Sequence, residues 1–263
     1  MSRSVLCAGS VPRLAAALAV LVLGAARSAA QAGEAPAPAD ESGWRYTLAP
    51  YYWATGFDGD LTLDGQSIEG DGDSSGFPGE LSLSGFLGHF EAEKGPWAFA
   101  LSPVFVNVEI DGDDAPTVDT DLSLSGAIVE GFAGYEFAAG WDVLGGVRYY
   151  DLDTEVDITV GGVPQPELSS GRGWFDPIVG VRYTGSFAEG WSFQGRADVG
   201  GFGLGSDFAW NASAVVGYEL STWSRAFLGY RALDFDFVDG SGSDRLEYDV
   251  RLWGPLIGVS FDL

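Results

Sequence analysis

The sequence predicts an all-β fold, a transmembrane antiparallel up-and-down β-barrel of about ten strands, with about eight or twelve strands as alternatives. Five segments that alternate apolar with small or polar residues each begin at a tryptophan, namely Trp44, Trp97, Trp141, Trp191 and Trp223. Four of these tryptophans follow a very short turn, and a long, acidic, glycine-rich stretch follows most of the segments. Short turns at one end, long loops at the other and aromatic residues near the short turns are typical of barrels that span a membrane.

The strands can be placed in order along the chain. Their predicted spans are 44–57, 81–94, 97–110, 121–138, 141–156, 174–188, 191–203, 207–220, 223–238 and 247–263. Short turns are expected near residues 95, 140, 190 and 222, on the periplasmic side together with both termini. A tilted strand needs about 9–11 residues to cross a bilayer, so every span is long enough. Glycine recurs too often for a long amphipathic helix.

Residues 1–32 are predicted to be a cleaved signal peptide. Arg3 and Arg13 precede an apolar run, and Ala30-Gln31-Ala32 has the small-x-small pattern of a signal-peptidase site. The apolar run is too short to cross a bilayer as a helix; an N-terminal membrane anchor is the alternative. The only cysteine, Cys7, leaves with this peptide, so we expect no disulfide in the mature chain.

Two further segments complete the predicted organisation. Residues 33–43, rich in alanine, proline and acidic residues, are predicted to be a disordered periplasmic tail. Residues 44–263 are predicted to form the barrel as one domain, because a barrel closes only as a unit and no linker divides this stretch.

The charge of the chain excludes nucleic acid as a partner. The predicted signal peptide holds three of the 13 basic residues and none of the 38 acidic ones, which leaves a net charge of about −28. Such a surface repels nucleic acid, and it does not suit a polybasic membrane-surface protein. No later run approaches the roughly 18 apolar residues of a transmembrane helix.

Alternation within the strands separates two faces. Trp191, Phe193 and Val199 share one face of their strand, whereas Arg196 and Asp198 share the other. A soluble periplasmic β-sandwich or lipocalin-like barrel has the same period with the opposite sense, apolar inward and polar outward, and is the competing interpretation. The asymmetry between short turns and long loops favours the membrane barrel.

Charged residues within the strands are expected to point into the lumen, because Arg or Lys facing lipid near the bilayer midplane costs about 2–4 kcal/mol. Counted from the short turns, one group falls in a layer roughly 18–25 Å above them. Its members are Glu130, Arg148, Arg182, Asp198 and Arg231. A second group lies lower and comprises His89, Glu91, Arg196, Glu219 and Arg225. Opposite signs at matching height predict Arg–carboxylate bridges across the lumen.

Several segments resemble those of Gram-negative outer-membrane β-barrel proteins. They are 44–56, Gly88-His89-Phe90-Glu91-Ala92, Gly146-Val147-Arg148-Tyr149, 195–203 and Gly254-Pro255-Leu256. The chain is most similar to a porin-like or OmpA-like group of these barrels whose function is not established. The resemblance implies a location in the bacterial outer membrane and assembly by the β-barrel assembly machinery. That machinery recognises an aromatic residue at the end of the last strand. Here the last residue is Leu263, so Phe261 would have to serve.

We therefore expect a narrow or closed barrel with a polar lumen of arginines and carboxylates. The function considered first for such a barrel is passive diffusion of small solutes. A structural or surface-interaction barrel is the alternative. An outer-membrane hydrolase is a third alternative, with little support: His89 is the only histidine, and Ser84 faces the other side of a regular strand. A nucleophile needs its base within hydrogen-bond reach, so no catalytic activity is expected.

The predicted outer loops are strongly acidic. Residues 58–80, 111–121, 151–173 and 234–249 together hold 23 of the 38 acidic residues and only two basic ones. No cofactor is expected, although oxygen ligands on such loops suit weak binding of a divalent cation. The residues nominated for it are Asp71, Asp73, Asp111, Asp113 and Asp114. The same loops would face outer-membrane lipid and lipopolysaccharide, whose phosphates also need bridging cations.

Overall fold

The computed structural model describes residues 43–63, 66–72, 87–111, 118–160, 162–164, 168–242 and 245–263. All of them belong to one compact unit, Pro38–Leu263. The predicted signal peptide and nearly all of the predicted tail lie outside the described residues. Within the described part of the chain, no helix is long and apolar enough to cross a membrane.

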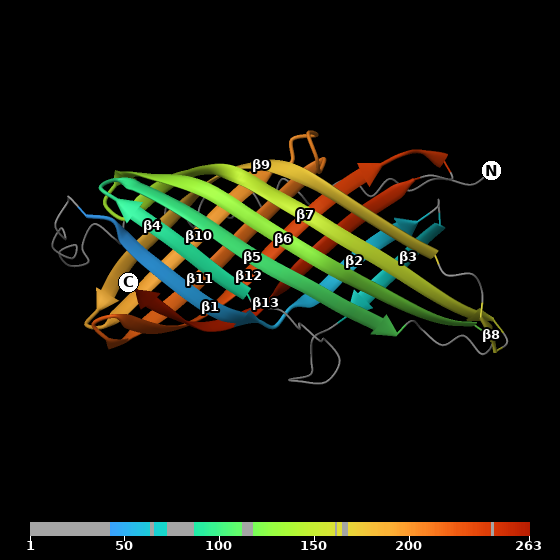
Figure 1. The fold of residues 1–263 in the computed structure, drawn as a ribbon, viewed down its shortest axis with the longest axis horizontal. Helices are drawn as coiled ribbons and strands as arrows, with labels where there is room; N and C mark the ends of the chain where they lie inside the picture. The colour runs from blue at the N-terminus through green and yellow to red at the C-terminus, as the bar shows by residue number, and fades with distance from the viewer. Residues whose placement is uncertain are drawn as a thin grey trace, which may run out of the picture. The chain divides into compact units, whose positions relative to one another are not determined.

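Nearly every described residue belongs to a β-strand (Figure 1). The strands are β1 (Arg45–Trp53), β2 (Gly56–Leu63), β3 (Gln66–Gly72), β4 (Leu87–Lys94), β5 (Trp97–Asp111), β6 (Val118–Ala138), β7 (Trp141–Val160), β8 (Val163–Pro164), β9 (Leu168–Ala188), β10 (Trp191–Gly200), β11 (Phe208–Ser221), β12 (Ser224–Asp239) and β13 (Leu246–Asp262). All pairings between them are antiparallel.

The sheet closes on itself. β1 pairs with β4 on one side and with β13 on the other, where Leu48 lies opposite Phe261. β2 continues β1 along β13, and β3 pairs with β2 as β4 pairs with β1. If β1 and β2 are counted as one wall strand, and β3 and β4 as another, the barrel wall has ten strands. Each is tilted to the barrel axis (Figure 1). The predicted ten-stranded up-and-down barrel is confirmed.

The predicted short turns lie where the sequence placed them, between β4 and β5, β6 and β7, β9 and β10, and β11 and β12. Gly95, Gly140 and Gly190 occupy three of these turns with positive φ angles of 54°, 73° and 72°. A side chain would be strained in that conformation. At Gly140 an added Cβ would also lie 2.3 Å from the carbonyl oxygen of Thr184.

Several strands extend further than predicted. β2 and β3 pair within 58–80, which was expected to be a loop. β6, β7 and β9 likewise extend into stretches that were predicted as loops. The prediction ended each strand where the apolar alternation stops. Backbone pairing between strands does not require an apolar outer face, so the ladders continue into polar sequence.

Candidate functional site: a lumen of ion pairs and stacked rings

Apolar side chains cover the outer wall over a limited height. Along each strand, outward residues alternate with buried ones, and Val147 of β7 and Leu228 of β12 are among the exposed outward residues. Further along the same strands the outward positions become charged, at Asp151 on β7, Asp234 on β12 and Arg251 on β13. Charges are costly on a lipid-facing wall. These residues therefore mark one edge of an apolar band.

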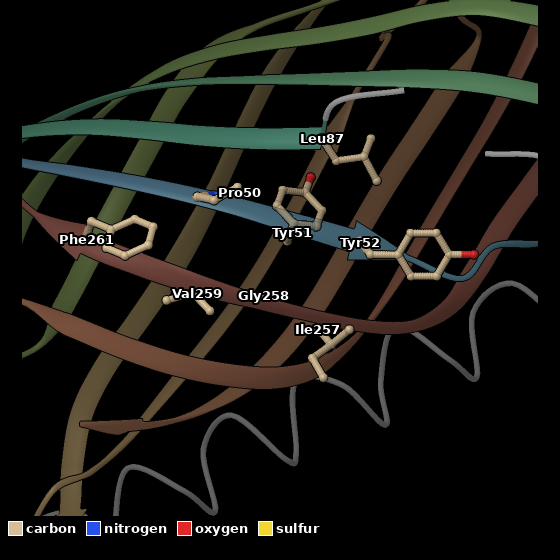
Figure 2. A pocket seen from close by; sticks show the side chains of 8 residues that line it. All are labelled: Pro50, Tyr51, Tyr52, Leu87, Ile257, Gly258, Val259 and Phe261. Atoms are coloured by element: carbon tan, nitrogen blue, oxygen red, sulfur yellow. The ribbon is translucent and has the colours of Figure 1, made fainter. Parts of the chain in front are cut away.

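Aromatic residues mark the other edge, at the short-turn end. Trp97 packs on Tyr135 and Trp191 on Tyr218, with ring centroids 5.0 Å and 4.9 Å apart. The seam between β1 and β13 carries a groove of about 400 Å³ whose lining runs from Phe261, near this end, to Tyr52 and Leu87 (Figure 2). An apolar band with an aromatic girdle on one side and charges on the other is typical of a membrane-spanning barrel.

Inside the barrel, two arginines and two carboxylates form a closed network. Arg148 is fully buried and donates to Glu130 Oε2 through Nε (3.0 Å) and Nη2 (2.6 Å), and to Asp198 Oδ1 through Nη2 (2.7 Å). Arg196 Nη1 donates to the other oxygen of Glu130 (2.5 Å), and Arg196 Nη2 lies 2.8 Å from Asp198 Oδ2. We name these four residues the ion quartet. Charge-assisted bonds of this kind are stronger than those between neutral groups.

Arg231 joins the ion quartet through an amide. Its Nε donates to Asn211 Oδ1 (2.8 Å), and Asn211 Nδ2 donates to Asp198 Oδ2 (2.8 Å). The guanidinium of Arg231 also lies over the ring of Trp53, 5.1 Å from its centroid. Asn211 was not among the lumen residues nominated from the sequence, although its inward position follows from the alternation of β11.

A second polar group lies beside β4. Arg182 forms an ion pair with Glu91, and its Nε donates to Asp142 Oδ2 (2.9 Å). His89 Nε2 lies 3.4 Å from Glu91 Oε2, and His89 Nδ1 lies 2.7 Å from the Oγ of Ser102. Ser102, and not Ser84, is the serine beside His89. The register of the β4–β5 hairpin identifies Ser102. Phe90 lies opposite Leu101, so the neighbouring residues His89 and Ser102 also face each other.

The structure groups two of the arginines differently from the sequence prediction. Arg196, expected in the lower group, contacts Glu130 and Asp198, whereas Arg182, expected in the upper layer, contacts Glu91. The strands of a barrel are staggered, and counting residues from each turn ignores that offset. The offset is visible where Trp141, the first residue of β7, lies opposite Tyr183 while β9 continues to Ala188. Glu219 and Arg225, both expected in the lower group, lie opposite each other on β11 and β12, 3.6 Å apart, with side chains 58% and 33% exposed.

Beyond the ion quartet, away from the short turns, the lumen is mainly apolar. Trp174 is stacked on Phe237 with centroids 4.0 Å apart and on Tyr150 at 4.7 Å, and Phe235 and Tyr248 lie within 6.0 Å of its ring centre. Its indole Nε1 donates to the Oγ of Ser206 (3.0 Å). We name Trp174 and the four rings around it the aromatic plug. Further members of the same buried cluster are Trp53, Leu87, Val104, Ile128, Leu152, Ala209, Leu233, Leu246, Val250, Leu252 and Leu256.

The aromatic plug was not foreseen, and the uniformly polar lumen of the prediction is wrong for this part of the barrel. The sequence does contain a signal for the apolar part of the lumen: apolar and acidic residues alternate strictly in Leu233-Asp234-Phe235-Asp236-Phe237. Above the apolar band the outer face meets water, so the acidic residues turn outward and the apolar ones fill the lumen. The alternation reverses its sense along a single strand.

Of the predicted cation ligands, only Asp71 and Asp111 belong to described strands. Asp71 lies in β3 and Asp111 ends β5, so neither is at a loop tip as predicted, because both strands extend into the expected loops. Asp73, Asp113 and Asp114 lie outside the described residues. Among described residues, no group of three or more His, Cys, Asp or Glu side chains is arranged to hold a metal ion.

Beyond the apolar band, the outer wall carries facing carboxylates. Asp236 and Asp249 lie opposite each other on β12 and β13, and Asp60 of β2 faces Asp249 from the other side. Partial burial and the neighbouring carboxylates raise the pKa of Asp236 and of Asp249. The folded barrel therefore binds these protons more tightly than the unfolded chain does. This contribution to stability falls as pH rises from the ordinary Asp value of 3.8 through the raised pKa values.

Replacing Asp249 with asparagine should stabilise the barrel at neutral pH and low salt. The expected gain is about 0.2–1 kcal/mol, since like charges directly opposite on paired strands are destabilising. Urea unfolding in detergent measures it. The gain should shrink in 1 M NaCl, where the Debye length is about 3 Å, and vanish near pH 3. Glu189→Gln, at an exposed turn residue, is the control; an equal gain there would contradict the pairing argument.

Comparison with known proteins supports the fold. The chain is similar to the outer membrane protease OmpT from Escherichia coli, with a TM-score of 0.51 and 7% identity over 85% of this chain and 98% of that one. Weaker matches include OprG from Pseudomonas aeruginosa (TM-score 0.36, 14% identity, 84% of this chain and 96% of that one) and Ail from Yersinia pestis (0.33, 10%, 84% and 99%). No family model and no curated protein matches the chain. The fold is that of Gram-negative outer-membrane β-barrels.

Proposed function

We propose that this chain is an integral barrel of the bacterial outer membrane, that its lumen is closed at rest, and that it acts as a structural or surface-interaction barrel. The observation that carries the proposal is the aromatic plug, whose rings are buried and stacked across the lumen. The apolar band and aromatic girdle support insertion in a membrane. The extracellular end would then present the acidic strands and loops.

Passive diffusion of small solutes is the second candidate function. The ion quartet and Arg231 form a polar layer of the kind that selects solutes by size and charge. A polar solute that passed this layer would next meet stacked rings and aliphatic side chains. Conduction would therefore require Trp174 or its neighbours to move, which is why we favour the closed barrel.

A hydrolytic function has one observation in its favour. Ser102, His89 and Glu91 form a row of the residue types that make a nucleophile, a base and an acid. Ser102 and Glu91 are buried, however, and Glu91 also binds Arg182. We propose that the row is a structural link within the lumen and not a catalytic site. The protease activity in the name of OmpT belongs to that protein.

The proposed acidic outer end suggests a role for divalent cations. Asp60, Asp236 and Asp249 project from its wall, and the outer leaflet beside it would carry phosphate. Calcium or magnesium would reduce the repulsion between like charges on the two surfaces. In this proposal, lipopolysaccharide is the partner of the outer end.

Refolding the chain into lipid vesicles and recording from planar bilayers tests the proposal. The folded barrel should migrate faster than the heated one on a gel and show a β-rich circular dichroism spectrum. Bilayers with verified insertion should stay electrically silent. Steady small-conductance openings would instead establish the diffusion pore. A mature chain that is a stable monomer in plain buffer would refute the membrane assignment.

A further inference from the structure

The loop that joins β10 to β11 differs from the other long connections in its chemistry. Residues 201–206 read Gly-Phe-Gly-Leu-Gly-Ser and carry no charge, whereas the acidic outer segments hold 23 of the 38 acidic residues. Two large apolar side chains of this loop are exposed: Leu204 at 80%, the largest value for a large hydrophobic residue in the described chain, and Phe202 at 53%. The loop therefore presents hydrophobic surface.

The loop is held firmly by hydrogen bonds. Within it, Gly203 N donates to Ser206 O and Leu204 N donates to Gly201 O, both at 3.0 Å. Ser206 N donates to Asp176 Oδ1 (2.7 Å), which ties the loop to β9. The exposed side chains are thus carried on an ordered support.

Phe202 has a φ of 54°, the only positive φ at a non-glycine residue in the described chain. A bulky side chain is disfavoured in that conformation, which glycine adopts freely. Strain of this kind persists only where the surrounding structure imposes it, and it occurs at sites of binding. The fold thus places an aromatic ring on the surface at a conformational cost.

The height of the loop identifies what the ring meets. β10 has ten residues, and a rise of about 3.3 Å per residue with a tilt near 40° places its far end roughly 25 Å above the short turn. The apolar band of a membrane barrel is also about 25 Å tall. Phe208, exposed at the start of β11, carries the apolar wall to this level, where it lies opposite Asp236 of β12, one of the charged residues at the end of the band. The loop therefore lies at the outer edge of the band.

We propose that loop 201–207 is a hydrophobic anchor, which inserts Phe202 and Leu204 among the acyl chains at the outer membrane interface. The proposal rests on the proposed membrane location of the barrel. Lipid is the occupant that fits, because residues 201–206 are uncharged, are continuous with the lipid-facing wall and lie at the depth where acyl chains meet headgroups; the exposed Asp207 ends the loop where it joins β11. A second copy of the chain is the competing occupant.

Single-cysteine fluorescence tests the anchor in the full chain. The sequence has one cysteine, Cys7, so a Cys7→Ser background leaves each introduced cysteine as the only thiol. Leu204→Cys reports on the loop, Leu228→Cys on the exposed outer wall and Ser241→Cys on an exposed acidic outer segment. Each is labelled with nitrobenzoxadiazole and refolded into phosphatidylcholine vesicles that carry a nitroxide at acyl carbon 5 or 12.

We expect the label at position 204 to emit at shorter wavelength than in water and to be quenched at least twofold more by the carbon-5 nitroxide than by the carbon-12 nitroxide. Position 228 should be quenched by both, and position 241 by neither. If 204 behaves like 241 while 228 is quenched, the anchor is refuted and the membrane barrel stands. If 228 is also unquenched, the membrane assignment itself fails. A blue shift at 204 that depends on protein concentration and not on lipid would assign the loop to self-association.

Discussion

Replacing Trp174 with alanine should lower the free energy of unfolding by about 3–5 kcal/mol, the range for deleting a large aromatic side chain from a packed interior. The indole stacks on Phe237 and Tyr150, and its Nε1 donates to Ser206 Oγ. Its removal leaves a cavity lined by rings and deprives the Ser206 hydroxyl of its donor. Urea unfolding of the refolded barrel in detergent measures the loss.

Two further observations separate lost packing from general damage. An engineered apolar cavity stays dry and accepts apolar ligands, so added indole should restore part of the lost stability in Trp174→Ala. Trp191→Ala removes a tryptophan from the outer wall and should show no such rescue. A loss below about 1 kcal/mol at Trp174, or equal rescue in both variants, would mean that the aromatic plug is not the tightly packed element described.

The outline of the barrel could be predicted because it depends on local patterns. Trp97, Trp141 and Trp191 follow short turns, and a chain that alternates between lipid and lumen shows that period directly in its sequence. The ends of the strands could not be predicted from the same signal. Once the outer wall leaves the membrane, its outward residues are free to be polar, and strands such as β2 and β3 continue to pair through their backbones.

The interior was predictable by residue type but not by partner. Every arginine nominated for the lumen faces a carboxylate or an amide. Arg182 lies in the group predicted for Arg196 and Arg196 in the group predicted for Arg182, because the sequence of a single strand does not define its stagger relative to its neighbours. The aromatic plug was missed for a different reason. Only charged residues were nominated for the lumen, whereas Phe235 and Phe237 share the inward face of Arg231 and fill the lumen beyond the height of the membrane.

Replacing Arg148 with methionine should destabilise the barrel by about 3–5 kcal/mol, the usual cost of removing one partner from a buried ion pair. Arg148 is fully buried and donates to both Glu130 and Asp198. Methionine fills similar space without a charge, so the quartet keeps two carboxylates and a single arginine. The expected loss comes from the uncompensated buried charge more than from any bond energy, and urea unfolding in detergent measures it.

A double variant makes that cause testable. Arg148→Met combined with Glu130→Gln again leaves one arginine facing one carboxylate, so it should recover part of the loss of Arg148→Met instead of adding to it. Arg225→Met, at the partly exposed pair with Glu219, should cost no more than about 1 kcal/mol. If the double variant is less stable than Arg148→Met, the hydrogen bonds of Glu130 outweigh the charge balance. The ion quartet would then stabilise the barrel mainly through its hydrogen bonds. Removing one arginine together with one carboxylate would not restore the lost free energy of unfolding.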